Sequence, residues 1–96
     1  MTINDIRDAN ESAGLHFFEP AAMRFFDSKV LPKVYEGPGG VYFVTSEQFH
    51  DGEYHAERKY TVREFNPENG RIWSNSEFNK VGKAEAQAGA RKLAKN

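Results

Sequence analysis

The sequence predicts an α+β fold: a three-stranded antiparallel meander packed by an N-terminal and a C-terminal helix, in the order helix–strand–strand–strand–helix. The first observation behind this is the pair of turn dipeptides, Asp51-Gly52 and Asn69-Gly70, which are strong hairpin signals. The second is that these dipeptides separate three runs rich in β-branched and aromatic residues. The third is helical spacing of apolar residues before and after these runs. The expected strands are 41–49, 54–65 and 71–79.

At 96 residues, the chain is expected to form a single domain, 1–96. Within it, residues 2–14 form a possible extra short helix, because Thr2 and Asp5 have the spacing of a capping box and Gly14 is a natural stop. Only its two isoleucines are strongly apolar, so the alternative is that residues 1–14 are a flexible arm that orders on a partner.

A better helix is expected to begin at Pro20, because proline is favoured at the first helical position. Met23, Phe26 and Val30 follow at spacings of three and four residues, which places them on one buried stripe. Pro32 is expected to end this helix.

The glycine-rich run Gly37–Gly40 resembles a phosphate-binding loop, but no Gly-Lys-Ser or Gly-Lys-Thr follows it. The next residues, 41–45, are β-branched and aromatic and predict a strand. No helix N-terminus would therefore face the run, and an ordinary turn is the better interpretation.

The C-terminal segment 84–95 is predicted to be a helix with an unusually small buried face. Small side chains would let the helix approach a sheet whose own side chains are large. This face repeats at intervals of three and four residues and consists of Ala86, Gly89, Ala90 and Leu93.

The period of a strand divides the middle strand between two faces of the sheet. One face is expected to pack against helices and carries Tyr54, Ala56, Tyr60 and Val62, interrupted by Arg58. The other is expected to be solvated and carries His55, Glu57, Lys59, Thr61, Arg63 and Phe65.

A partner-binding surface is predicted on the solvated face. If Ile72 points to the core, then Trp73 and Arg71 would point to the solvent beside Arg63 and Lys59. Tryptophan and arginine dominate interaction hot spots. The competing interpretation is that Trp73 is packed under the N-terminal segment or a loop, since a lone tryptophan in a small domain is usually at least partly buried. The predicted partner-binding residues are Lys59, Arg63, Arg71, Trp73 and His55.

The first hairpin gathers His50, Asp51, Glu53 and His55, which are residue types that bind metals. Turns are rich in aspartate, however, and no second group of ligands is evident, so a solvated hairpin tip is the better interpretation. We expect no metal and no cofactor. The absence of cysteine, of a Gly-x-Ser-x-Gly elbow and of paired carboxylates in an apolar setting favours a non-enzymatic protein.

Composition narrows the classes of partner. Thirteen basic and 14 acidic residues give a formal charge of −1, which argues against a sequence-blind nucleic-acid binder. With no cysteine, the core stands without disulfides. The polar N-terminus shows no signal peptide, and no apolar run is long enough to span a membrane, so a cytoplasmic location is expected.

The chain resembles a family of small uncharacterised proteins found in phages and bacteria. The residues that carry the resemblance span most of residues 15–94, and they are Phe18-Glu19-Pro20, Met23 to Val30, Gly40 to Glu47, Tyr60 to Arg63 and the tail from Phe78 to Ala94. The resemblance implies a phage or mobile-element context and brings no catalytic residues.

The sequence leaves three functions open. The first is a compact protein-binding module, for which the expected role is inhibition of a host defence complex of the anti-CRISPR type. The second is nucleic-acid binding, because the expected element order is also that of double-stranded-RNA-binding domains. This alternative would use the basic residues near the C-terminus, Lys80, Lys83, Arg91, Lys92 and Lys95. The third is a structural part of a larger assembly.

Overall fold

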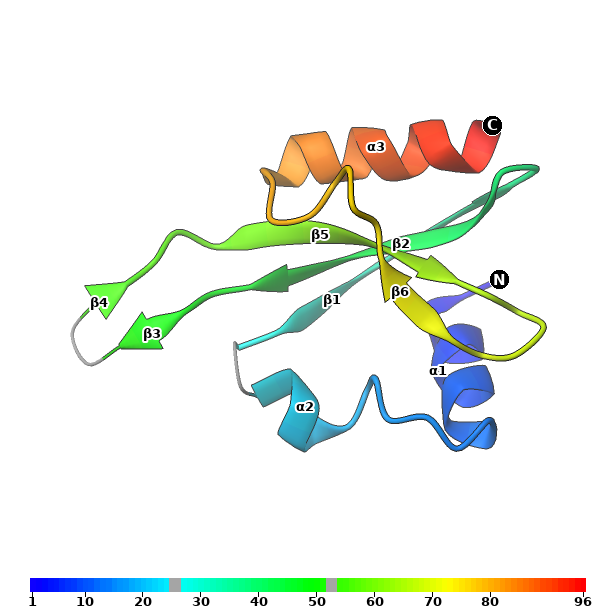
Figure 1. Ribbon diagram of the computed structural model, residues 1–96, viewed down its shortest axis with the longest axis horizontal. Coiled ribbons are helices and arrows are strands. Elements are labelled where there is room, and N and C mark those ends of the chain that lie inside the picture. Colours follow the sequence, from blue (N-terminus) through cyan, green and yellow to red (C-terminus); the bar gives the residue numbers. More distant parts are fainter. Residues whose placement is uncertain (25–26, 52–53) are drawn as a thin grey trace.

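The computed structural model describes the backbone of residues 1–24, 27–51 and 54–96, and the side chains of all of these except 50, 51, 54 and 55. The α+β class is confirmed, with helices at both ends of the chain (Figure 1). In order, the elements of the described chain are α1 (Ile3–Ser12), α2 (Pro20–Arg24), β1 (Lys29–Gly37), β2 (Gly40–Glu47), β3 (His50–Asp51), β4 (Tyr54–His55), β5 (Lys59–Phe65), β6 (Ile72–Ser74) and α3 (Lys83–Lys95).

The main sheet has four antiparallel strands in the order β1-β2-β5-β6, one more than the expected three. The short pair β3-β4 extends the hairpin of β2 and β5 away from the rest of the molecule (Figure 1). The predicted strand 71–79 is shorter than expected and ends at Ser74. From there the chain crosses to α3, and it stays beside β5 through a hydrogen bond from the Val62 N–H to the Phe78 carbonyl and a bridge between Tyr60 and Val81.

The additional strand corrects the prediction of a helix reaching Pro32. Helix α2 ends at Arg24, and residues 29–37 form β1. Proline cannot donate a ladder hydrogen bond, so within a sheet it is confined to edges and bulges. Pro32 meets both conditions, because β1 is an edge strand whose register shifts between Val30 and Val34. The spacing of Phe26 and Val30 is therefore not a helical stripe, and Phe26 itself lies outside the described residues.

Helix α3 covers one face of the sheet, as its small residues predicted (Figure 1). Ala86, Gly89 and Ala90 are buried, and Leu93 is partly buried. Gly89 faces Phe78, whose ring would lie 2.6 Å from a Cβ at this position. The first core cluster therefore joins the sheet to α3, and it consists of Tyr35, Tyr42, Val44, Val62, Ala86, Ala90 and Ala94.

The opposite face is not solvated throughout, which corrects a second expectation. Phe65, assigned to the solvated side, is only 5% exposed. Helix α1 and the segment with Phe17 and Phe18 cover this end of the sheet, where the rings of Phe18 and Phe43 stack with centroids 6.1 Å apart. The second core cluster consists of Ile6, Phe18, Val41, Phe43 and Phe65.

The N-terminal segment is a docked helix rather than a loose arm. Its predicted capping box is confirmed: the Thr2 hydroxyl accepts from the Asp5 N–H at 3.2 Å, and the Asp5 carboxylate accepts from the Thr2 N–H at 2.8 Å. These hydrogen bonds lower the pKa of Asp5. Ile6 is fully buried and Asn10 is 1% exposed. The Asn10 amide donates to the carbonyl of Gly70 at 2.9 Å and accepts from the Phe17 N–H at 3.2 Å.

The run Gly37–Gly40 is the expected turn, and the structure shows why it is rich in glycine. It joins β1 to β2 and rests against the last turn of α3, where the Gly39 N–H donates to the Ala94 carbonyl at 3.0 Å. A Cβ on Gly39 would overlap the carbonyl oxygen of Leu93, and a Cβ on Gly37 would overlap that of Ala94. The glycines therefore allow backbone to approach backbone.

Gly39→Ala is expected to destabilise the protein by roughly 1–3 kcal/mol, because the added methyl group has to displace backbone at the end of α3. Gly82→Ala is the matched control, since a Cβ there meets nothing within 4 Å. Urea unfolding followed by far-ultraviolet circular dichroism measures both variants. Equal stabilities for the two would contradict the docking of the turn on the helix.

Candidate functional site

A groove lies on the face that α1 covers, at the end of the sheet that the cover does not reach. It has a volume of about 610 Å³. We call it the open groove, and it is formed by the end of β2, strand β5, the end of β6 and three segments that connect strands and helices. The lining residues are Glu47, Phe49, Ala56, Glu57, Lys59, Thr61, Arg63, Ser74, Asn79 and Lys80.

Arg63 forms the floor of the open groove, and its guanidinium is held on several sides. Nε donates to the Thr45 hydroxyl at 2.8 Å, Nη1 donates to the Ser74 hydroxyl, and Nη2 lies 3.3 Å from the Glu47 carboxylate. The guanidinium also lies 5.4 Å from the centre of the Phe17 ring. This arrangement orients the side chain before any ligand arrives.

Burial of the Arg63 side chain, of which 18% is exposed, lowers the pKa of its guanidinium, whereas the neighbouring Glu47 carboxylate acts to raise it. The second carboxylate oxygen of Glu47 is buried without a hydrogen-bond partner in the described part of the chain. The ion pair is thus partly removed from solvent, and each charge depends on the other.

The rim of the open groove combines cations with an aromatic side chain. Lys59 is exposed and lies 3.3 Å from the carboxylate of Glu57. Lys80 is exposed at a positive φ of 59°, and its N–H donates to the Thr61 hydroxyl at 3.1 Å. Phe49 is 51% exposed. Aromatic rings and cations around a polar floor are typical of interaction surfaces.

The structure divides the predicted partner-binding residues. Lys59 and Arg63 both line the open groove, whereas Arg71 and Trp73 line a separate hollow of about 330 Å³. The reason is the strand register: Ser74 pairs with Arg63, and Trp73 pairs with Glu64. Side chains alternate along a strand, so Trp73 and Arg63 belong to opposite faces, and their predicted shared face is wrong.

Trp73 is 44% exposed, so it lies at the surface rather than under the N-terminal segment. The hollow that it lines with Arg71 also includes His16, whose Nδ1 lies 2.7 Å from a carboxylate oxygen of Glu19. The fifth predicted residue, His55, lies outside the described side chains. So do the other members of the metal-like group, His50, Asp51 and Glu53.

The five cations of the nucleic-acid alternative are exposed but are not gathered at one place. Lys80 lines the open groove, whereas Arg91 and Lys95 line a hollow at the opposite end of α3. Lys83 and Lys92 line neither. The observed element order also differs from the expected one, since four strands form the main sheet and the short pair β3-β4 is inserted.

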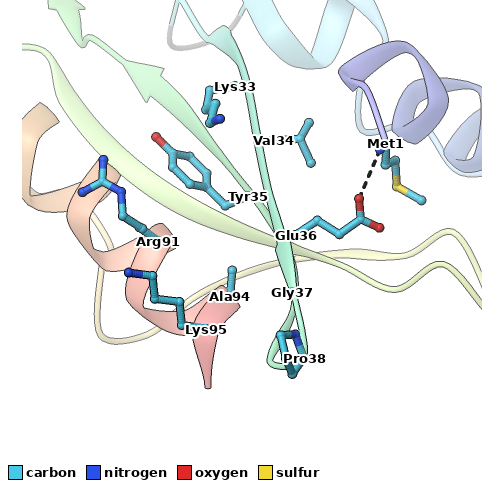
Figure 2. A pocket seen from close by; sticks show the side chains of 10 residues that line it. All are labelled: Met1, Lys33, Val34, Tyr35, Glu36, Gly37, Pro38, Arg91, Ala94 and Lys95. Carbon is cyan, nitrogen blue, oxygen red and sulfur yellow. Dashed lines mark hydrogen bonds and ion pairs between the residues drawn. The ribbon is translucent and has the colours of Figure 1, made fainter.

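The hollow at the end of α3 is a site that the sequence prediction missed. It runs along the outer edge of β1, has a volume of about 460 Å³, and is shown in Figure 2. We call it the edge cleft. Strand β1 lies where the sequence predicted a helix and a turn, so the sequence could not place the residues of this strand beside α3. The residues that line the edge cleft are Met1, Lys33, Val34, Tyr35, Glu36, Gly37, Pro38, Arg91, Ala94 and Lys95.

The fold and its hollows define a small α+β domain whose four-stranded sheet is covered by helices on both faces and left open at one end. A family model described as a family of unknown function, DUF7447, matches residues 2–92, and the chain belongs to this family. No curated protein and no solved structure matches this chain. No helix in the described residues is long and apolar enough to cross a membrane.

Removing the Arg63 guanidinium is expected to destabilise the fold by about 1.5–3 kcal/mol, because its hydrogen bonds to Thr45, Ser74 and Glu47 are lost together. The substitutions Arg63→Gln and Glu47→Gln, with the double variant, form a cycle measured by urea unfolding. The double variant should be less destabilised than the sum of the two single variants. Strict additivity would contradict the coupling of the two charges.

Proposed function

We propose that this protein is a non-enzymatic protein-binding module and that the open groove receives its partner. The observation that carries the proposal is the groove itself: a hollow over the uncovered part of the sheet, lined by an arginine that hydrogen bonds already hold in place. A strand-borne side chain held by several hydrogen bonds loses little conformational freedom when a partner docks. Such preorganised sites favour binding.

The chemistry of the groove fits a protein surface. Its lining mixes an exposed aromatic ring, aliphatic carbon and charges of both signs, as the centre and rim of protein interfaces do. Lys59 and Lys80 at the rim would meet carboxylates, and Phe49 would meet apolar side chains. Side chains from the sheet and from three connecting segments share the same hollow, so a partner could contact several segments at once.

The biological role is proposed from the resemblance described above and from size. A compact, cysteine-free domain that resembles small proteins of phages and bacteria fits a mobile-element protein that acts in the host cytoplasm. Within that class we propose inhibition of a host defence complex, of the anti-CRISPR type. The open groove supplies a surface through which such an inhibitor could bind.

Nucleic-acid binding has less support than protein binding. Charges that neutralise successive phosphates have to follow one backbone. Here the cations divide between the open groove, the edge cleft and the remainder of α3. Binding to duplex RNA or DNA that weakens steeply with salt, and that is lost on charge reversal at Lys83 and Arg91, would favour nucleic-acid binding over protein binding.

The double variant Lys59→Glu/Lys80→Glu is expected to lose at least nine-tenths of the captured partner, because both exposed rim cations become anions. Affinity capture from a lysate of the natural host measures the loss, with nuclease-treated and untreated arms. Lys83→Glu/Lys92→Glu is the matched control, since it makes the same charge change at exposed positions of α3 outside the groove. Equal loss from both variants, or capture that requires nucleic acid, would overturn the proposal.

Trp73→Ala tests the predicted residue that the structure separates from the groove. The side chain is half exposed, so truncation should change the free energy of unfolding by less than about 1 kcal/mol. If the partner contacts the open groove alone, capture stays unchanged. Loss of capture with stability retained would show that the interface extends around β6.

A further inference from the structure

Strand β1 is an edge strand whose regular part, Val34–Gly37, follows the register shift after Val30. Its inner side pairs with β2, and no other described strand pairs with its outer side. An exposed strand edge presents unpaired backbone N–H and C=O groups, which form a template for another strand. Together with Lys33, these residues span roughly 16 Å, enough for a short extended peptide.

The edge cleft borders this strand, and one of its sides is strongly basic. Lys33 and Tyr35 point from β1 toward the side where α3 carries Arg91 and Lys95 (Figure 2). The Lys33 ammonium lies 5.8 Å from the centre of the Tyr35 ring. Among the described residues, none of these three cations forms an ion pair with a carboxylate. An occupant with carboxylates would supply the missing counter-charges.

The other side of the strand has a different character. Val34 and Glu36 point away from α3, toward Met1 (Figure 2). The one carboxylate that lines the cleft, that of Glu36, is already paired with the Met1 ammonium at 3.1 Å. Val34 is partly buried and packs against the second core cluster. The edge therefore separates a cationic side from a side with an apolar residue and a neutralised acid.

We propose that the outer edge of β1 binds an extended acidic peptide segment of a partner protein, which adds to the sheet as a fifth strand. Backbone hydrogen bonds would provide the pairing, and alternate side chains would provide the selectivity. Carboxylates at every second position would face Lys33, Arg91 and Lys95. The intervening positions would face Val34 and would be apolar.

A second copy of this chain fits the same edge less well. Pairing of two β1 edges about a twofold axis would bring two sets of Lys33, Arg91 and Lys95 together. Like charges placed opposite each other destabilise strand pairs. Lysine and proline on an edge strand also disfavour pairing between identical chains, and β1 carries Lys29, Pro32 and Lys33.

This interface is separate from the open groove, since the two hollows share no residue. The Lys59→Glu/Lys80→Glu variant should therefore bind the acidic peptide within twofold of wild type. Failure of the proposed function and failure of this inference can thus be told apart.

The test uses a fluorescein-labelled peptide of sequence Glu-Val-Glu-Val-Glu-Val and a matched Lys-Val-Lys-Val-Lys-Val peptide, with binding to the full chain measured by fluorescence anisotropy. We expect the acidic peptide to bind at least twentyfold more tightly at low salt. Arg91→Glu/Lys95→Glu should weaken its binding at least tenfold. Lys83→Glu/Lys92→Glu, with the same charge change outside the cleft, should leave it within twofold of wild type.

Backbone N-methylation tests strand addition itself. Successive N–H groups of a strand point to opposite edges, so methylation of either the Glu or the Val residues should abolish binding, and methylation of the other set should preserve it. Circular dichroism melting verifies that each protein variant is folded.

Three results would overturn the inference. One is no binding of the acidic peptide at 1 mM, on the order of the weakest specific affinities. Another is equal binding by the cleft variant and its control, and the third is indifference to both methylation patterns. A concentration-dependent dimer in sedimentation, lost in the cleft variant and accompanied by no peptide binding, would assign the edge to a second copy instead.

Discussion

Strands β2 and β5 carry large apolar side chains on both faces, and the rest of the molecule is arranged to cover them. Val44 and Val62 face α3, whereas Phe43 and Phe65 face α1. A sheet with one apolar face could leave the other to solvent, but a sheet with two has to be a middle layer. The chain meets this requirement by placing a helix from each of its ends on opposite sides (Figure 1).

The two covers differ, and the difference creates the hollows. Helix α3 has a small face that lies close to the sheet, and its last turn meets the glycine turn between β1 and β2. The cover on the other face is short, and its aromatic pair Phe17-Phe18 reaches only the half of the sheet around Phe43. Beyond it, polar residues replace aromatic ones along the same strand faces: Thr45 and Thr61 are buried beside Arg63. The open groove begins where the core becomes polar.

Local signals predicted much of this arrangement. The capping box at Thr2, the turn glycine at Gly70 with its positive φ of 74°, and the small face of α3 are all as expected, because each depends on residues close in sequence. The missed strand has a different cause. Val30 follows Met23 and Phe26 at a spacing that suits a helix, and a proline such as Pro32 commonly ends a helix. In the structure, however, the edge position and the bulge make Pro32 compatible with β1.

The sequence placed only some residues of the open groove together, because a local pattern relates residues within one strand but not residues on different strands. Lys59 and Arg63 lie on one strand, so alternation placed them together correctly. Trp73 lies on another strand, and its face depends on the loop that joins the strands. The Gly70 N–H returns to the Asn66 carbonyl, so the turn is wider than an Asn-Gly dipeptide implies, and the register places Ser74 beside Arg63. Lys80 and the edge cleft depend on contacts between distant segments, which no local pattern encodes.

The buried amide of Asn10 has a further consequence, which concerns alignment. Its donor and its acceptor have different partners, the Gly70 carbonyl and the Phe17 N–H. Both hydrogen bonds can form together in only one rotation and one axial position of α1. Apolar packing tolerates sliding, whereas a buried amide that loses a partner is left with an unsatisfied polar atom. Asn10 therefore selects one docked arrangement of α1 among the many that apolar packing alone would allow. Because Phe17 is the ring against which Arg63 lies, the angle at which the first helix docks also sets the boundary of the open groove.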